Sequence, residues 1–319
     1  MKQTKTQDKT FDAIIIGAGV TGLAAGMYAA RLGLKNLILG TTSASELPIG
    51  GVITTTEIVE NYPGFIKLTG PELAKKLENH ALSYSEVTIK EEKAVDISKL
   101  KSGFVVKTED SEYRTKAIIY AAGAKWKLLP MKGAQEFANK GVHYCALCDG
   151  AIYKDKIIAV IGGSDTAAKE ALLLSEHGKK VYIIYRGEKI RPEPINAKRV
   201  ENNKKIEVLL NTNVLEIKGE KLVKGVVLDR EYNGKKELEL DAVFGAIGSV
   251  PLSELAQKIG VKVNKKGEII IDRESKTNIP GFFAAGDVVD TSFKQAITGV
   301  AEGVTAAHSA YEYISNEDL

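Results

Sequence analysis

Cysteine is nearly absent from this sequence: in 319 residues it occurs only at Cys145 and Cys148. Two cysteines exclude the framework of several bridges that holds small secreted domains together. Histidine occurs four times, at positions 80, 143, 177 and 308, and this scatter gives none of the paired ligands of a structural zinc site. The sequence therefore predicts no metal site.

Neither sign of charge dominates, because 44 Lys and Arg residues stand against 41 Asp and Glu residues. The net charge of +3 is too small to predict a nucleic-acid or membrane partner. No apolar run approaches the ~18 residues that span a bilayer, and the polar first residues lack the apolar core of a signal peptide. We therefore expect a soluble, cytoplasmic protein, with a length of 319 residues that allows two domains.

The two cysteines lie three positions apart in the segment HYCALCDG, residues 143–150. A Cys-x-x-Cys disulfide closes a small ring that opens and closes at modest strain, and a helix beginning near Asp149 would lower the thiolate pKa. A structural disulfide across two residues would remove little loop entropy. We therefore favour a working dithiol over a structural disulfide or zinc site. His143 is expected to be a surface or packed residue rather than a catalytic one.

The first glycine-rich turn follows a short apolar run, residues 13–16, which is typical of a strand buried on both faces. Gly17, Gly19 and Gly22 have G-x-G-x-x-G spacing, and residues 23–32 and 37–39 then predict a helix and a second strand. This βαβ unit is typical of dinucleotide binding. The second strand ends in Gly-Thr-Thr at 40–42, without the usual acidic residue for the ribose.

The same pattern recurs at residues 157–185. A buried strand at 157–161, a helix through residue 176 and a partner strand at 181–185 surround a second turn. That turn consists of Gly162, Gly163, Ser164, Asp165 and Thr166. Ser164 occupies the middle glycine position, where it crowds a pyrophosphate but has a hydroxyl to donate to a phosphate. Two separate dinucleotide domains explain the repetition best.

Nine Lys or Arg residues lie between positions 179 and 205, and most are expected to form a solvated face. Arg186 and Arg191 differ because they follow the strand 181–185, where the adenosine ribose of a bound dinucleotide lies. An arginine there suits a 2′-phosphate.

The rest of the chain reads as alternating elements. Residues 50–65 are expected to be an ordered connecting loop and 71–82 an amphipathic helix, while 87–120 alternate like antiparallel strands and 206–246 are β-rich. Near the C-terminus a strand ends at Gly286-Asp287, before a helix that continues to residue 314. Asp287 would accept hydrogen bonds from flavin ribityl hydroxyls or cap a helix.

Together these segments resemble the small bacterial and archaeal thioredoxin reductases, which are FAD-containing pyridine nucleotide-disulfide oxidoreductases. The resemblance extends from Asp12 to Ile314, and its most specific element is the segment Cys145–Gly150. Further matches are the first glycine turn, ENYPG at 60–64, Gly286-Asp287-Val288 and Gln295-Ala296. The resemblance implies an α/β fold with two Rossmann-like domains and a homodimer. An NAD(P)H domain at 124–248 would be inserted in an FAD domain formed by 1–123 and 249–319.

The resemblance also assigns binding residues. FAD would contact Gly17, Gly19, Gly22, Asn61, Gly286, Asp287, Gln295 and Ala296. NADPH would contact Gly162, Gly163, Ser164, Asp165, Thr166, Arg186 and Arg191. The chain departs from the family where Ser164 replaces a glycine and Asp165 an asparagine, and its His-Arg-Arg-x-x-x-Arg signature keeps only the first and last arginine.

The implied activity is electron transfer from NADPH through FAD and the Cys145–Cys148 disulfide to a thioredoxin-like protein. Family behaviour gives Cys148 the flavin side and Cys145 the attack on the partner disulfide. Asp149 would be the acid–base group or a helix N-cap. The two domains are expected to rotate about hinges near 123–126 and 246–250. Alternatives are NADH, a ferredoxin or a deazaflavin as donor, a flavin dithiol oxidase, and a non-enzymatic redox sensor.

Overall fold

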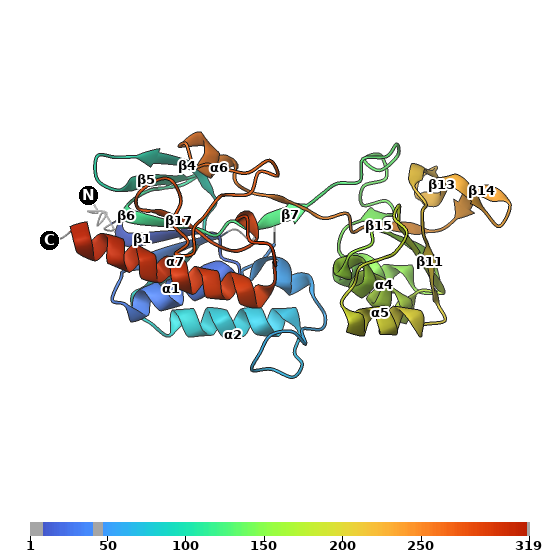
Figure 1. Ribbon diagram of the computed structural model, residues 1–319, viewed down its shortest axis with the longest axis horizontal. Helices are drawn as coiled ribbons and strands as arrows, with labels where there is room; N and C mark the ends of the chain where they lie inside the picture. Colours follow the sequence, from blue (N-terminus) through green and yellow to red (C-terminus); the bar gives the residue numbers. More distant parts are fainter. Residues whose placement is uncertain (1–8, 41–46, 318–319) are drawn as a thin grey trace, which may run out of the picture. The chain divides into compact units, whose positions relative to one another are not determined.

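The computed structural model describes residues 9–40 and 47–317. The polar segment 1–8 and the two threonines at 41 and 42 lie outside the described residues. The chain divides into two compact units, Met1–Lys125 with Val250–Leu319 and Trp126–Ser249 (Figure 1). Both are built on parallel sheets with helices, so the expected α/β class is confirmed.

The first unit contains a seven-stranded sheet in the order β3-β2-β1-β6-β5-β4, with β17 also paired to β6. Its strands are β1 (Thr10–Ile16), β2 (Asn36–Gly40), β3 (Val87–Glu91), β4 (Ala94–Lys99), β5 (Phe104–Thr108), β6 (Glu112–Tyr120) and β17 (Phe282–Ala284). Strands β3, β2, β1, β6 and β17 run parallel, and only β4 and β5 are antiparallel to their neighbours. The antiparallel prediction for 87–120 is therefore wrong for β3, which pairs in parallel with β2.

The helices of this unit are α1 (Val20–Arg31), α2 (Gly70–Leu82), α6 (Glu254–Lys258) and α7 (Ala296–Glu317). Helix α2 confirms the amphipathic helix expected at 71–82, and its N-terminus is closed by a capping box between Thr69 and Glu72. Helix α1 packs against α7 (Figure 1). Thr21 of α1 lies so close to Gly299 and Gly303 of α7 that a Cβ at either glycine would approach within 2.6 Å of it.

The second unit contains a five-stranded parallel sheet in the order β11-β10-β9-β15-β8 and a three-stranded antiparallel sheet, β12-β13-β14. Its elements are β8 (Val142–His143), α3 (Ala146–Asp149), η2 (Gly150–Tyr153), β9 (Ile157–Ile161), α4 (Asp165–His177), β10 (Lys180–Ile184), α5 (Pro194–Glu201), β11 (Ile206–Leu209), β12 (Val214–Gly219), β13 (Val223–Tyr232), β14 (Lys235–Glu239) and β15 (Ala242–Gly245). The β-rich prediction for 206–246 is confirmed.

The chain passes between the units twice, at β7 (Ala124–Trp126) and β16 (Ser249–Pro251), and these two segments pair as a two-stranded sheet. Within residues 9–40 and 47–317, no helix combines the length and apolar character needed to cross a membrane.

Candidate active site

The first glycine turn joins β1 to α1, and its glycines are needed for different reasons. Gly17 has φ 115°, and a Cβ there would lie 2.1 Å from the carbonyl oxygen of Ala121. A Cβ at Gly22 would lie 1.8 Å from the carbonyl oxygen of Gly17, so this glycine lets helix and turn pack closely. A Cβ at Gly19 would meet only the oxygen of Gly50, at 3.7 Å. The protein itself therefore does not require glycine at position 19, and the space beside it suits a ligand that approaches the backbone.

A second segment is tied to this turn. The N–H of Gly50 donates to Ala18 O at 2.8 Å, and the N–H of Val20 donates to Gly50 O at 3.2 Å. Residues following Gly50 form a short 3-10 helix, η1 (Gly51–Thr55). The sequence predicted a plain connecting loop here. The φ of 109° at Gly50 shows a constrained position, and the paired glycines at 50 and 51 were the one signal for it.

The C-terminal segment reaches the same turn. After β17 the chain forms a 3-10 helix, η3 (Gly286–Val288), and a Cβ at Gly286 would lie 2.6 Å from Thr21 Oγ1 of α1. Asp287 lies within η3, and no side chain caps that helix. Burial raises the pKa of Asp287, and Lys294 opposes this shift. Asp287 is therefore brought next to the first turn as a partly desolvated carboxyl group rather than as a helix cap.

Two further predicted residues meet directly. The side-chain amide of Asn61 donates to Oε1 of Gln295 at 3.0 Å, across 234 positions of sequence. Gln295 immediately precedes α7, and its N–H donates to Thr298 Oγ1 at 3.0 Å. The bond joins the loop containing ENYPG to the start of α7, so residues from both ends of the chain converge in this unit.

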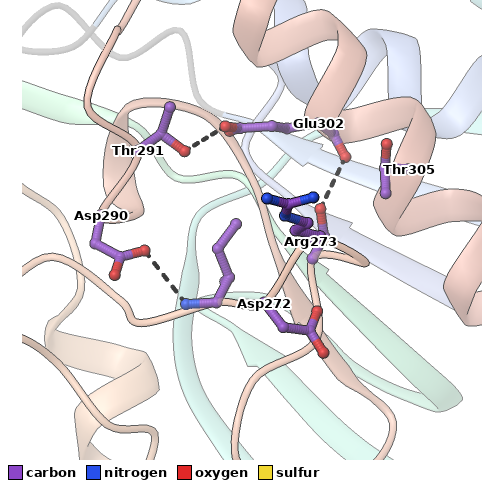
Figure 2. Close-up of a pocket in the computed structure, with 8 residues that line it drawn as sticks. Asp272, Arg273, Asp290, Thr291, Glu302 and Thr305 are labelled. Atoms are coloured by element: carbon purple, nitrogen blue, oxygen red, sulfur yellow. Dashed lines mark hydrogen bonds between the residues drawn. The ribbon is translucent and has the colours of Figure 1, made fainter.

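A polar pocket of about 480 Å³ lies between residues 271–275, residues 290–291 and helix α7. Its lining includes Asp272, Arg273, Asp290, Thr291 and Glu302 (Figure 2). Glu302 accepts the hydroxyl of Thr291 with one carboxylate oxygen (Figure 2). Its other oxygen accepts the N–H of Gly286 at 2.8 Å. Glu302 of α7 thus supports the Gly286 turn. Within the described residues no group of acidic, histidine or cysteine side chains could hold a metal ion.

The second glycine turn joins β9 to α4. Ser164 is the N-cap residue of α4, is exposed, and makes no side-chain capping bond. Thr166, in the first turn of α4, is also exposed. The N–H of Arg191 donates to Gly163 O at 2.6 Å, so the segment after β10 folds back onto this turn. This contact brings the backbone of Arg191 and the turn together.

Asp165 is engaged within the protein. Its Oδ1 accepts the N–H of Glu193 and the side-chain amide of Asn196, both at 2.8 Å, and its Oδ2 pairs with Lys169 Nζ at 2.8 Å. Burial opposes ionisation, but these donors together lower the pKa of Asp165. Asp165 therefore ties α4 to the start of α5, and both of its carboxylate oxygens have partners within the protein.

Tyr185 sits between two glycines. A Cβ at Gly163 would lie 2.5 Å from its ring, and one at Gly187 would lie 2.7 Å from it. Arg186, between Tyr185 and Gly187, is exposed, as is Arg191. The aromatic ring thus takes the space that larger residues at 163 and 187 would need, and the two arginines remain at the surface.

Cys145 and Cys148 form a disulfide at the start of α3. Cys145 is the N-cap residue, and its Sγ accepts the N–H of Cys148 at 3.1 Å. The helix therefore begins at Ala146 rather than near Asp149, and the N-terminal amides point at Cys145. Cys145 is 6% exposed, whereas Cys148 is exposed.

Asp149 contacts His143 instead of capping a helix. It stands at the N-cap position of η2, but its side chain makes no capping bond. Its Oδ2 lies 3.1 Å from His143 Nδ1, which is ion-pair distance without the alignment of a hydrogen bond. His143 is packed, as one of the sequence alternatives had it, and its imidazole lies next to the predicted acid–base residue.

Glu170 was not predicted. It lies on α4, which packs against α3, and its carboxyl group accepts the N–H of Ala146, the residue after Cys145. Its Oε2 is buried without a hydrogen-bond partner in the described part of the chain. Burial raises the pKa of Glu170 to about 8. A glutamate inside an amphipathic helix gives no sequence signal that it faces inward.

The family model for pyridine nucleotide-disulphide oxidoreductases matches residues 11–303. The chain belongs to this family. It is 37% identical over 315 residues to the thioredoxin reductase of Bacillus subtilis, covering 97% of this chain and 96% of that one. The crystal structure of Lactococcus lactis thioredoxin reductase matches with a TM-score of 0.90 and 36% identity, covering 96% of this chain and 99% of the other. That of T. acidophilum thioredoxin reductase matches with a TM-score of 0.89 and 35% identity, covering 98% and 100%. The predicted family and fold are confirmed.

Proposed function

We propose that this protein is a flavin-dependent thioredoxin-disulfide reductase that uses NADPH. The observation that carries the proposal is the disulfide between its only two cysteines, at the start of α3 in the unit that holds the second glycine turn. The family membership and the full-length similarity to thioredoxin reductases support the same activity. A redox sensor without enzymatic activity would have no need of two dinucleotide turns.

The first unit suits FAD. The open space beside Gly19 and the α1 N-terminus, which no side chain caps, suit the pyrophosphate. Asp287 would accept hydrogen bonds from the ribityl chain, and the Asn61–Gln295 pair would help to hold the cofactor. Bound FAD would supply two-electron transfer between a nicotinamide and a disulfide.

The second unit suits NAD(P)H through backbone and arginine groups. The exposed Ser164 and Thr166 offer hydroxyls to the phosphates, while Gly162 and Gly163 form the turn. Asp165 would act indirectly, because its carboxylate holds α5 in place. Arg186 and Arg191 are the groups available to a 2′-phosphate, so we propose NADPH as the preferred donor.

The cysteine chemistry balances with NADPH as the reductant. NADPH would supply two electrons and one proton, and solvent the second proton, which together convert the Cys145–Cys148 disulfide to a dithiol. The Cys145 thiolate then attacks the partner disulfide and releases one partner thiolate, which takes up a proton. Cys148 attacks Cys145 in the mixed disulfide, so the second partner sulfur leaves and takes up the other proton. Asp149 would accept and return a proton in these steps. Because Cys145 is buried, its attack requires a conformation that uncovers it. Because one flavin cannot face the nicotinamide and the disulfide from the same side at once, we also propose rotation of the units about the β7 and β16 connections.

Thioredoxin or a thioredoxin-like protein is the proposed disulfide partner, and we propose a homodimer that works in the cytoplasm. A compartment that keeps thiols reduced is where a dithiol donor of this kind operates.

Anaerobic titration tests the proposal. The purified yellow protein should bleach on addition of NADPH, with NADH less effective, and the reduced protein should then reduce thioredoxin. Bleaching by neither nucleotide, but by reduced ferredoxin or deazaflavin, would replace NADPH as donor. Ser164 and Gly187, which depart from the family pattern, favour this second candidate. Oxygen consumption with a small dithiol, without thioredoxin reduction, would identify a dithiol oxidase.

A further inference from the structure

His143 is held on three sides. It is 5% exposed, its ring stacks on Phe244 with centroids 5.3 Å apart, and its Nε2 lies 2.7 Å from the hydroxyl of Tyr153. Its Nδ1 lies 3.1 Å from Asp149 Oδ2 and has no hydrogen-bond partner within the described residues. Burying an imidazole whose Nδ1 has no hydrogen-bond partner costs free energy. Packing alone does not explain that cost, and the half-exposed carboxylate of Asp149 lies next to this nitrogen.

The neighbours define the tautomer. An ionised Asp149 only accepts hydrogen bonds, so the favourable proton position on a neutral imidazole is Nδ1. Nε2 is then the acceptor, and the Tyr153 hydroxyl donates to it. The Tyr153 hydroxyl thus donates to His143, whose Nδ1–H lies beside the Asp149 carboxylate as a partial positive charge without forming an aligned hydrogen bond.

We propose that His143 is a positioning residue that holds Asp149 ready for proton transfer at the cysteine pair, and that Tyr153 fixes the imidazole for this task. The inference rests on the proposed function, because it assumes that Asp149 accepts a proton from a cysteine thiol and returns it to a leaving thiolate. No proton is lost in this cycle: the one that leaves the thiol resides on Asp149 until the partner sulfur takes it up.

The carboxylates that influence His143 and Tyr153 are those of Asp149 and Asp241. Burial lowers the pKa of His143, and the Asp149 carboxylate opposes that shift. Burial also raises the pKa of Tyr153, with contributions from Asp149 and Asp241. His143 is therefore neutral at neutral pH, and Tyr153 retains its proton. In this state the Nδ1–H of His143 places a partial positive charge beside the Asp149 carboxylate.

Two substitutions separate the two nitrogens. In His143→Asn the amide nitrogen can take the place of Nδ1, and in His143→Gln it can take the place of Nε2. Both lose the ring and its stacking on Phe244. His177→Gln, at an exposed histidine of α4, is the matched control. The cysteine pair is reduced chemically in the flavin-loaded protein, and the single-turnover rate with a chromogenic aromatic disulfide is measured against pH.

We expect the acidic limb of this profile to move upward by about one pH unit in His143→Gln, because the partial positive charge of the Nδ1–H beside the Asp149 carboxylate is lost. His143→Asn should stay close to the wild type, as should His177→Gln. Asp149→Asn should lack the limb, and adding His143→Gln to it should change the rate by less than about twofold.

Equal losses in His143→Asn and His143→Gln, or a loss that is the same at every pH and persists in Asp149→Asn, would assign His143 to packing and overturn the inference. Because this reaction requires neither nicotinamide nor thioredoxin, failure of NADPH-driven turnover would refute the proposed function without changing this result.

Discussion

Replacing Glu170 by glutamine should change the pH dependence of stability more than any other single substitution on α4. The carboxyl group accepts the N–H of Ala146, its other oxygen is buried without a partner in the described chain, and burial raises its pKa to about 8. Glutamine keeps the acceptor for Ala146 and remains neutral at every pH. The comparison therefore isolates the ionisation of one buried acid.

The direction and size of the expected change in unfolding free energy follow from the linkage between proton binding and folding. An acid with a raised pKa in the folded state contributes stability that is fully present below its unfolded pKa and is lost as pH rises through the folded pKa. For Glu170 that window runs from the ordinary value of 4.5 to about 8. A shift of this size corresponds to roughly 5 kcal/mol in total, of which about 3 to 4 kcal/mol falls between pH 5 and pH 8.

The assay is urea unfolding of both proteins between pH 5 and pH 8, followed by far-UV circular dichroism. The unfolding free energy of Glu170→Gln minus that of the wild type should rise by about 3 to 4 kcal/mol over this range, because the other titrating groups cancel in the difference. Glu176→Gln, at an exposed glutamate of the same helix, is the control. Difference infrared spectroscopy should show a protonated carboxyl group at pH 7 that Glu170→Gln lacks.

A difference that stays constant or falls with pH would mean that Glu170 is ionised in the folded protein. The buried, neutral carboxyl group would then be the wrong description, and an unobserved donor would have to satisfy its second oxygen.

Three further predictions concern the cofactors and the cysteine pair. Cys145→Ser should leave a thiolate at Cys148 that gives a long-wavelength charge-transfer band with the flavin, and Cys148→Ser should give none; equal absorption spectra would refute the assignment. Gly17→Val should expel the flavin, because its Cβ would lie 2.1 Å from Ala121 O, and a yellow purified variant would contradict this. Arg186→Ala should raise the KM for NADPH about tenfold or more, the loss of one charge-assisted contact, while leaving the KM for NADH nearly unchanged. Steady-state kinetics with both nucleotides decides this, and an unaltered preference would exclude Arg186 from phosphate binding.

The sequence predicts those parts of the fold that have local signals. The apolar runs at 13–16 and 157–161, each followed by a glycine turn and a helical segment, predict both βαβ units because strand, turn and helix are contiguous. Strand alternation, by contrast, does not reveal a partner. Strand β3 has the alternation of an antiparallel strand, but it pairs in parallel with β2, which precedes it by about fifty residues.

The candidate site likewise contains residues that the sequence predicts and residues that it does not. Its cysteines, glycines and arginines stand in recognisable spacings, but their supporting residues come from distant strands. His143 meets Phe244 because β8 pairs in parallel with β15, a pairing across about a hundred residues. The burial of Glu170 likewise depends on α3 packing against α4. Such residues have no local pattern, and only the tertiary fold defines their roles.

The residues proposed to select the electron donor depend on one another for space. Tyr185 stands where the family signature has histidine, and its ring occupies the space beside Gly163 and Gly187. An arginine restored at 187 would bring a Cβ within 2.7 Å of that ring, so it could enter only if Tyr185 moved or changed. The residues at 185 and 187 are therefore coupled, because the tyrosine ring excludes a larger residue at position 187. We propose that nucleotide preference in this chain depends on the two arginines that remain exposed, Arg186 and Arg191. The backbone N–H of Arg191 already fixes its segment to Gly163.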